Sequence, residues 1–344
     1  MFGFQMTDYD KKVFAEQLAD FLPDQIIDCH VHIDRPGSDC EDAAQRKGCV
    51  SWPGKVAKDC TIEDLMASYE AMFPGKTVRP VLMTSPTHRL ETENPYALAC
   101  GKKYGLPVMY CVTYKTTKEE IRQAFADGFC GIKPYQNHSA PYIPANEVRI
   151  FDFLTPEHLE AVNELGGVVM LHISRPKRLR DEVNLAQMLE IEEKYPRVKL
   201  IIAHIGRAYS PEDIGDAFEV LRDTKNMVFD FTANTLDLAM EKVLTYFGSK
   251  RLLFGSDMPI TKMRMYRVSE NGVYYNVVPR GLYGDVSDDV HMRETDDASH
   301  ITTFMNEELL AFKRAALRVG LSREEVFDVM CGNAARIFNM EVKK

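Results

Sequence analysis

The chain has 344 residues, of which 45% are hydrophobic and 27% are charged, and its formal net charge is −9. This length accommodates one large α/β barrel or two ordinary domains, and the composition excludes a disordered protein. The acidic balance excludes non-specific nucleic-acid binding, although a locally basic pocket is still compatible with an anionic small-molecule substrate.

Short apolar runs alternate with segments that place apolar residues at helical spacing. The apolar runs are rich in Val, Ile, Leu and Met, which is typical of strands buried on both faces. Two helical segments begin at Thr-Pro-Glu and Ser-Pro-Glu, where a hydroxyl cap precedes a proline and an acidic residue. In chain order, the predicted elements are a helix at 8–22, strand Ile26–His32, helix Thr61–Phe73, strands Val78–Ser85 and Pro107–Tyr114, helix Thr117–Asp127, strand Cys130–Tyr135, helix Pro156–Leu165, strands Val168–Ile173 and Lys199–Ile205, helix Pro211–Arg222, strand Met227–Thr232, helix Leu236–Phe247 and strand Leu252–Asp257.

Eight strands that alternate with helices indicate parallel βαβ units, and eight is the number that closes into a TIM barrel. We therefore predict an α/β fold, a single (β/α)8 barrel domain over residues 1–344, with the helix at 8–22 as an addition before the first strand. Long loops at 33–60, 136–154 and 258–300 follow predicted strands. Such loops lie at the C-terminal mouth of a barrel, where the active sites of this fold are built.

The start of the chain and its cysteines bear on the location of the protein. The first residues bring acidic side chains early and lack the apolar core of a signal peptide, and no run approaches about 18 apolar residues. The eight cysteines form no CxxC pair, and Cys40, Cys49 and Cys60 share one loop with a spacing unlike that of known zinc clusters. We therefore predict a cytoplasmic protein without a membrane segment or a disulfide framework.

The first predicted strand ends in Asp28-Cys29-His30-Val31-His32. Residues two apart in a strand face the same side, so we expect His30 and His32 to project together into the barrel mouth, and Asp28 to face the same way one layer deeper. Two imidazoles placed in this way form a clamp for a borderline cation such as Zn²⁺. On its own, a His-x-His pair is equally compatible with two half-buried structural histidines.

Three further strand ends carry candidate ligands. His172 lies at the end of the fifth predicted strand, His204 at the end of the sixth and Asp257 at the end of the eighth. A single histidine of this kind is most simply a core residue with a buried partner. Four histidines and an aspartate on one rim would each need a separate partner, so a shared site is the better interpretation.

On these residues the chain resembles the amidohydrolase superfamily, whose pattern is His-x-His on strand one, His on strands five and six, and Asp on strand eight. The Asp-Cys-His-Val-His opening, Gly-Ser-Asp-Met-Pro at 255–259 and Gly-Asn-Ala-Ala-Arg-Ile-Phe at 332–338 resemble its amidohydrolase-2 branch. That branch contains aminocarboxymuconate-semialdehyde decarboxylase and related decarboxylases as well as lactone and amide hydrolases. The resemblance extends from residue 26 to residue 338 and implies the fold and a metal site, not the substrate.

By this resemblance, His30, His32, His172 and Asp257 bind one divalent metal ion, with Zn expected and Mn or Fe as alternatives. Zn²⁺ lowers the pKa of bound water to about 7, and Asp257 is then the catalytic residue that accepts the proton of this water and passes it to the leaving group. His204 is the second catalytic candidate. It either binds a second metal, which is the weaker alternative, or contacts the substrate and moves a proton.

Three cationic side chains near the predicted strand ends are open to two interpretations. Lys133 lies in Gly-Ile-Lys-Pro-Tyr at the end of the fourth strand. In binuclear relatives a lysine at this point is carboxylated and bridges two metals, but we favour an unmodified lysine that faces the substrate or a salt-bridge partner. Arg175 and Arg207 follow strands five and six, and each is either a clamp for a substrate carboxylate or a solvated loop residue.

The leading functional hypothesis is a metal-dependent hydrolase of a small carbonyl compound, such as a lactone, an amide or a cyclic ester. The first alternative is a non-oxidative decarboxylase of a small aromatic or unsaturated carboxylic acid on the same metal site. The second is a binding protein with a degraded site. The identity of the substrate stays open, and so does the oligomeric state, a homo-oligomer included.

Overall fold

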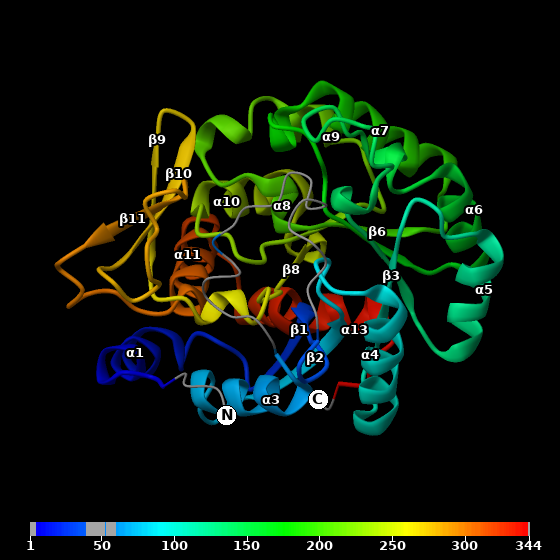
Figure 1. The fold of residues 1–344 in the computed structure, drawn as a ribbon. Helices are drawn as coiled ribbons and strands as arrows, with labels where there is room; N and C mark the ends of the chain where they lie inside the picture. Colours follow the sequence, from blue (N-terminus) through cyan, green and yellow to red (C-terminus); the bar gives the residue numbers. More distant parts are fainter. Residues whose placement is uncertain (1–4, 39–51, 53–59, 343–344) are drawn as a thin grey trace.

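Eight short parallel strands, one at each predicted apolar run, form the centre of the computed structural model (Figure 1). The structure describes residues 5–38, 52 and 60–342. The strands are β1 (Gln25–His32), β2 (Thr77–Met83), β3 (Met109–Val112), β4 (Gly131–Pro134), β5 (Val168–Leu171), β6 (Lys199–Ile202), β7 (Val228–Asp230) and β8 (Leu252–Leu253).

The strands pair in chain order around a ring. Ladders join β1 to β2 and run in sequence from β3 to β8, all of them parallel. A parallel bridge between Leu82 and Val108 joins β2 to the start of β3. A second bridge, between Val31 and Met258, joins β1 to the segment after β8, and the His32 N–H donates to the Met258 carbonyl at 2.9 Å. The predicted α/β barrel is therefore confirmed.

Most of the barrel strands end earlier than predicted, because the chain leaves the extended conformation at the mouth. Arg175, His204 and Asp257, which follow β5, β6 and β8, have φ values of 67°, 56° and 57°. Residues other than glycine adopt positive φ at a cost, and such positions concentrate at functional sites. The predicted strands thus included residues that turn away from the sheet to build the mouth.

Helices surround the strands. They are α1 (Asp8–Val13), α3 (Ile62–Met72), α4 (Leu90–Tyr104), α5 (Lys118–Asp127), α6 (Pro156–Leu165), α7 (Glu182–Lys194), α8 (His204–Arg207), α9 (Ala217–Leu221), α10 (Asp237–Phe247), α11 (Phe304–Val319), α12 (Arg323–Phe327) and α13 (Asn333–Phe338). Short 3-10 turns occupy Gln136–His138, Ile150–Asp152, Arg178–Arg180, Pro211–Asp213, Ser249–Arg251 and Ile260–Lys262, and π-helical turns occupy Phe14–Leu18 and Asp328–Gly332. None of the helices in the described parts of the chain has the length and apolarity needed to span a bilayer.

Two predicted helices differ from the structure. The segment 8–22 is α1 followed by a π-helical turn that ends at Leu18. The segment 211–222 is a 3-10 turn followed by α9, because Gly215 between them has a φ of 52° that a continuous helix does not allow. Both corrections concern the ends or continuity of a predicted helix and leave its place in the chain unchanged.

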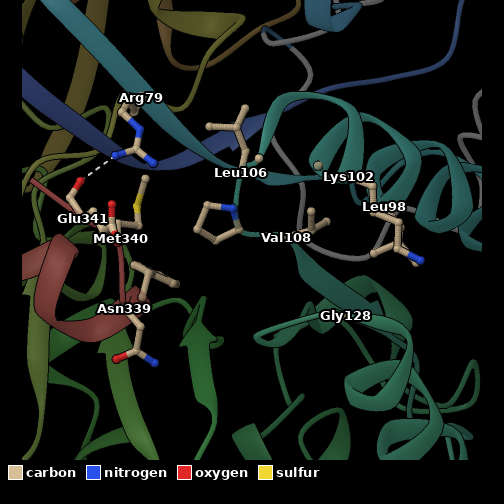
Figure 2. A pocket seen from close by; sticks show the side chains of 13 residues that line it. Arg79, Leu98, Lys102, Leu106, Val108, Gly128, Asn339, Met340 and Glu341 are labelled. Atoms are coloured by element: carbon tan, nitrogen blue, oxygen red, sulfur yellow. Dashed lines mark hydrogen bonds between the residues drawn. The ribbon is translucent and has the colours of Figure 1, made fainter.

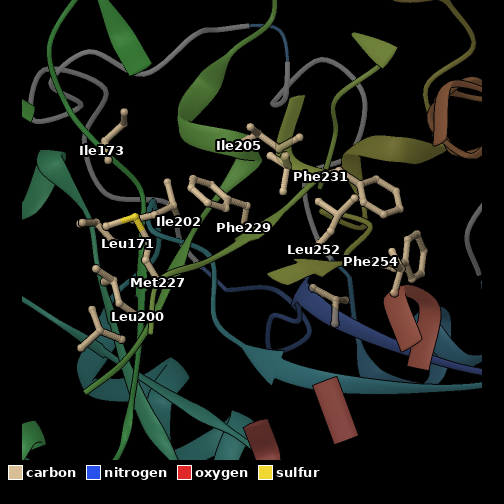
Figure 3. Packing of buried hydrophobic residues seen from close by; sticks show 14 of the residues in the cluster. Leu171, Ile173, Leu200, Ile202, Ile205, Met227, Phe229, Phe231, Leu252 and Phe254 are labelled. Atoms are coloured by element: carbon tan, nitrogen blue, oxygen red, sulfur yellow. The ribbon is translucent and has the colours of Figure 1, made fainter. Parts of the chain in front are cut away.

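Side chains of the strands alternate between two apolar layers. One cluster contains Ile27, Met109, Met170 and Leu253, which come from strands all around the ring and can meet only inside it. Residues of α13 join this cluster, so α13 closes the end of the barrel at which the strands begin. The second cluster faces the surrounding helices and includes Leu171, Ile202, Phe229, Phe231 and Phe254 (Figure 3).

A bulge in β1 separates the directions of two polar side chains. The pairing of β1 with β2 shifts register between Asp28 and Val31. The Asp28 carboxylate accepts a hydrogen bond from the Tyr69 hydroxyl of α3 at 2.6 Å, whereas His30 lies inside the mouth, with Nε2 3.0 Å from Lys133 Nζ. The prediction that Asp28 faces the same way as His30 is therefore wrong, because an inserted residue reverses the alternation of side chains.

The predicted loop at 258–300 contains a small sheet that stands beside α11 at one side of the barrel (Figure 1). Its strands are β9 (Tyr266–Glu270), β10 (Val273–Pro279) and β11 (Met292–Thr295), in the order β11-β10-β9. Asn271 and Gly272 connect β9 to β10 with positive φ values of 52° and 77°, as a tight hairpin turn requires. Of the other predicted loops, 136–154 contains two 3-10 turns, and most of 33–60, including Cys40 and Cys49, lies outside the described residues.

Candidate metal centre

Three side chains at the mouth converge to the spacing of metal ligands. One ligand atom from each of His30, His32 and Asp257 lies within 4.8 Å of the other two. Asp257 Oδ1 is 3.0 Å from His32 Nε2 and 3.8 Å from His30 Nε2. The two histidines come from β1, and Asp257 follows β8, where its N–H donates to the His30 carbonyl at 2.8 Å. Pairing between the first and last strands thus sets the geometry of this group.

His172 and His204 border this group but are not members of it. The ring of His204 lies 5.0 Å from that of His30, and the ring of His172 lies 5.2 Å from that of His204. His172 Nδ1 is buried and has no hydrogen-bond partner in the described residues. Buried polar nitrogens are normally paired, so this atom fits a ligand role. The structure therefore brings all five predicted side chains to one rim, with the tightest spacing among three of them.

Asp230, at the end of β7, holds two of these histidines and was not identified from the sequence. Its Oδ2 lies 3.2 Å from His30 Nδ1, and its Oδ1 accepts from the N–H groups of His204 at 2.7 Å and Thr232 at 3.3 Å. A carboxylate on Nδ1 fixes the proton there and leaves the Nε2 lone pair available, as metal-binding histidines require. Burial alone would raise the pKa of Asp230, but the charge and hydrogen bond of His30 lower it to about 2.

Backbone carbonyls orient two further rings. His32 Nδ1 lies 3.1 Å from the Thr84 carbonyl, and His204 Nδ1 lies 2.8 Å from the Thr232 carbonyl. A carbonyl accepts only, so each Nδ1 carries the proton and each Nε2 is left with a lone pair. His32 Nε2 and Asp257 Oδ1 face one another at 3.0 Å, so either a proton on Nε2 or a cation joins the two atoms.

The electrostatics favour neutral His30 and His172 and an ionised Asp257. Burial lowers the pKa of His30 to about 3, with the charge of Lys133 adding to the effect, and burial and the neighbouring His204 lower the pKa of His172 well below its usual value. Burial would raise the pKa of Asp257, but the hydrogen bond with His32 and the electrostatic interactions with His204, His30 and His32 hold it below its usual range. Metal ligands must be deprotonated, and this is the state that the site favours.

These observations fit a divalent cation. Imidazole nitrogens of His30 and His32 and an ionised carboxylate converge, and a cation bound there would take the place of the proton that otherwise joins His32 Nε2 to Asp257 Oδ1. The unpartnered Nδ1 of His172, whose ring lies next to that of His204, is a further buried nitrogen that a ligand role would satisfy. Nitrogen and oxygen donors of this kind suit Zn²⁺, and also Mn²⁺ or Fe²⁺.

Gly255 makes the approach of β1 to the end of β8 possible. A Cβ atom at this position would lie 2.3 Å from Thr232 Oγ1 and 2.7 Å from the Cβ of His30. Both contacts are far below van der Waals distance, so only glycine fits here without moving the histidine. The N–H of Ser256, the next residue, donates to the Asp28 carboxylate at 2.9 Å. This hydrogen bond holds the backbone in position directly before Asp257.

A sequence model of the amidohydrolase family matches residues 27–340, which is most of the chain. The chain belongs to the amidohydrolase family. Members of this family are hydrolases or carboxy-lyases, so the protein is an enzyme of one of these two kinds. No curated protein matches the sequence at a significant level.

Solved structures of amidohydrolases share the fold. A probable 2-pyrone-4,6-dicarboxylic acid hydrolase from Acinetobacter baumannii with bound citric acid has a TM-score of 0.55 and 18% identity, and the match covers 91% of this chain and 99% of the other. A zinc-bound amidohydrolase from Burkholderia multivorans has a TM-score of 0.59 and 16% identity, over 92% and 100%. A 5-carboxyvanillate decarboxylase from Sphingomonas paucimobilis has a TM-score of 0.50 and 12% identity, over 93% and 100%.

The cationic side chains predicted from the sequence have different surroundings in this family member. Lys133 is fully buried against His30 and the ring of Tyr135, and burial lowers its pKa to about 8. Arg175 donates to the Asp181 carboxylate at 2.8 Å, so a protein carboxylate already engages it. Among the described residues, Arg207 makes only long contacts, of 3.4 and 3.5 Å, to backbone carbonyls, and its charge contributes to the low pKa of His172.

A surface pocket of about 370 Å³ lies at the opposite end of the barrel, where the strands begin (Figure 2). It lies between the end of α4 and the chain after α13, and Arg79 donates to the Glu341 carbonyl across it at 2.7 Å. Catalytic groups of this fold gather at the other end. The pocket is therefore remote from the metal centre.

Proposed function

We propose that this amidohydrolase is a metal-dependent hydrolase that acts on a small carbonyl compound, such as a lactone, an amide or a cyclic ester. One divalent cation, most simply Zn²⁺, is held by His30, His32, His172 and Asp257. The observation that carries the proposal is the convergence of His30, His32 and Asp257 within 4.8 Å. The neutral, oriented histidines and the unpartnered Nδ1 of His172 support it.

A cation bound by these ligands supplies Lewis acidity, which lowers the pKa of water and polarises a carbonyl group. Asp257 is ionised and reaches into the mouth, so it is placed to accept a proton from a water molecule and to return it to the leaving group. His204 has its Nδ1 proton committed to the Thr232 carbonyl, so its Nε2 can accept a proton but not donate one in the neutral state. This fits a proton acceptor or a substrate contact.

The proposal includes one metal and an unmodified Lys133. Lys133 Nζ lies 3.0 Å from His30 Nε2, and its lowered pKa of about 8 leaves a fraction neutral at ordinary pH. A second ion would lie about 3.5–4 Å from the first and would need a bridging ligand to offset the repulsion between the cations. The four proposed ligands already complete a mononuclear site with room for water.

A non-oxidative decarboxylase is the second candidate. The same ligands would serve it, and the similar structure of a 5-carboxyvanillate decarboxylase supports this alternative. In that case His204 would act on the carbon centre, and the substrate would be a small aromatic or unsaturated acid. A binding protein with a degraded site is the weakest candidate, because the ligand group is intact in spacing and protonation. The cytoplasmic location and a homo-oligomeric state stay predictions.

The test combines metal analysis with a substrate screen. Protein reconstituted with Zn²⁺, Mn²⁺ or Fe²⁺ is assayed on lactones, amides and cyclic esters, and on hydroxybenzoates with detection of released CO₂. We expect about one metal per chain and metal-dependent hydrolysis. His32→Ala should lose both, and His300→Ala, which changes an exposed histidine, should keep both.

The other outcomes separate the candidates. Release of CO₂ without hydrolysis supports the decarboxylase, and turnover that is independent of metal excludes both metal-dependent candidates. Two metals per chain, or a mass increase of Lys133 that corresponds to a carbamate, contradict the mononuclear site. In His204→Ala, loss of turnover with full metal content supports the catalytic role of His204, whereas loss of metal makes it a ligand.

A further inference from the structure

Three arginines surround a pair of tyrosines beside His204. The ring of Tyr209 lies 6.3 Å from that of His204 and 5.0 Å from that of Tyr274. The guanidinium carbon of Arg267 is 5.0 Å from the Tyr209 ring and 4.5 Å from the Tyr274 ring, and that of Arg178 is 5.3 and 5.2 Å from the same rings. We call Arg178, Arg207, Arg267, Tyr209 and Tyr274 the arginine–tyrosine cluster.

The cluster is assembled from separate parts of the chain. Arg178 lies in the turn after β5, Arg207 and Tyr209 follow β6, and Arg267 and Tyr274 lie on the inserted sheet, on β9 and β10. Arg178 and Arg267 lie over the same two tyrosine rings, and Arg207 is two residues before Tyr209, so the fold brings three arginines to this side of the mouth. Bringing three like charges together is unfavourable, so such an arrangement is typical of a site that receives an anion.

Arg267 is held in place by groups that are not carboxylates. Its Nε donates to Asn276 Oδ1 at 2.9 Å and its Nη1 donates to the Ala233 carbonyl at 3.0 Å. The backbone N–H of Ala233 is fixed as well, because it donates to the buried Glu308 carboxyl group at 2.8 Å. Ala233 has a positive φ of 47°, so its backbone is locked in an unusual conformation that aims the carbonyl at Arg267.

The cluster carries more positive charge than its protein partners neutralise. Arg178 is paired with Asp213 at 2.7 Å, but neither Arg207 nor Arg267 has an ion pair within the described residues. Burial raises the pKa of Glu308, an acid that interacts electrostatically with Arg267, well above its usual value, which disfavours a compensating negative charge there. A chain with a net charge of −9 therefore concentrates uncompensated positive charge beside its metal centre.

Several guanidinium donors of the cluster have no protein partner among the described residues. A guanidinium group has five N–H donors. Within the described residues, Arg178 commits only Nη1, Arg207 only Nη1 through its long contacts, and Arg267 only Nε and Nη1. None of their nitrogens is among the fully buried atoms left without a partner, and all three side chains are partly exposed, so the uncommitted donors are not sealed in the core.

We propose that the arginine–tyrosine cluster binds a carboxylate group of the substrate, so that the enzyme acts on acids whose reacting group lies at the metal centre. Guanidinium forks bind planar carboxylates through paired charge-assisted hydrogen bonds. Tyr209, between His204 and the arginines, lies under the part of the substrate that connects the two groups. This inference rests on the proposed function, because it takes the metal centre as the reacting end.

The test measures binding and does not depend on turnover. Zinc-reconstituted protein is titrated calorimetrically with isophthalate and glutarate, and with their monocarboxylate counterparts benzoate and butyrate. One carboxylate of each ligand can occupy the metal centre, and only the dicarboxylates have a second for the cluster. A hydrogen bond to a charged group contributes about 1.5–3 kcal/mol, which corresponds to an advantage of roughly 10- to 150-fold for a dicarboxylate.

Arg267→Gln should reduce the ratio of dicarboxylate to monocarboxylate affinity at least tenfold. Arg267→Lys keeps the positive charge but lacks the paired donors of a guanidinium group, so it should reduce this ratio less. Arg293→Gln is the matched control, because Arg293 lies on β11 of the same sheet but is paired with Glu270 and stacked on Tyr275. It should keep the full advantage. If Arg267→Gln loses its native circular dichroism, Arg207→Gln is measured in the same way and decides the question.

Three results would overturn the inference: no dicarboxylate advantage in the unmodified protein, an equal advantage in the folded arginine variants, or tighter arginine-dependent binding of inorganic phosphate than of any dicarboxylate. The outcome also separates this inference from the proposed function. Metal-dependent turnover without any effect of the arginines refutes the carboxylate site alone. Arginine-dependent dicarboxylate binding in a protein without metal-dependent turnover refutes the proposed function and leaves the anion site in place.

Discussion

Replacement of Asp230 by Asn is the most direct test of how the histidines are oriented. The Oδ1 atom can still accept from the N–H groups of His204 and Thr232, at 2.7 and 3.3 Å in the native protein, so the backbone should stay in place. The amide NH₂ then takes the position of Oδ2, 3.2 Å from His30 Nδ1. An amide nitrogen donates only, so His30 must accept at Nδ1 and carry its proton on Nε2.

The cost of this change is the loss of the Nε2 lone pair of His30. Removal of the carboxylate partner of a metal-binding histidine typically weakens metal affinity by about 10- to 100-fold, which corresponds to about 1.4–2.8 kcal/mol. The amide has nearly the same size as the carboxylate, so the loss should appear in zinc binding much more than in the unfolding midpoint of the metal-free protein.

The measurement is a competition titration of zinc against a chromogenic chelator. Asp237→Asn is the control, because Asp237 lies on α10 and pairs with Arg314 and Arg318 outside the barrel. It should bind zinc as the unmodified protein does. Zinc affinity of Asp230→Asn within twofold of the unmodified value, with native circular dichroism, would show that His30 is not a ligand oriented by Asp230.

Two other predictions concern stability. Gly255→Ala places a Cβ atom 2.3 Å from Thr232 Oγ1 and 2.7 Å from the Cβ of His30. We therefore expect the free energy of unfolding, measured in urea, to fall by about 1–3 kcal/mol and the zinc content to fall with it. An unchanged unfolding midpoint and zinc content would contradict the close approach. Burial lowers the pKa of His158, which contacts the Thr116 carbonyl from α6, below its usual 6.5. The unfolded chain therefore takes up this proton first, and the native state loses stability as the pH falls below about 6.5. In His158→Gln the free energy of unfolding should fall less steeply between about pH 6.5 and 5, and an unchanged slope would refute this reasoning.

The barrel and its ligand positions could be predicted because they depend on local patterns. Strands buried on both faces are recognisable as apolar runs, and His30 and His32 share a direction because strand residues alternate. The direction of Asp28 could not be predicted in the same way, since a bulge changes the alternation without a mark in the sequence. The turns at His204 and Asp257, where predicted strands end early, depend likewise on contacts between strands.

Other features have a recognisable signal in the sequence. Asp230 is a charged residue within an apolar run, which indicates a buried polar role. Asn271-Gly272 between alternating residues is a strong hairpin signal, although 258–300 was interpreted as a loop. Helix α4 contains Pro95 and few regularly spaced apolar residues, which explains why it was not predicted. The meeting of Arg178 with Arg267 has no local signal, because tertiary packing alone brings them together.

The inserted sheet has a consequence for how enzymes with this scaffold diverge. In the described structure its strands pair only with one another, and the segment leaves and re-enters the barrel at adjacent points, where Arg264 forms a bridge with Thr303. Insertions and exchanges are tolerated best where both ends of a segment meet at the surface. Exchange of this segment would change the residues that contact the substrate carboxylate and leave the metal ligands in place. Substrate selectivity and the reaction at the metal centre can therefore evolve independently.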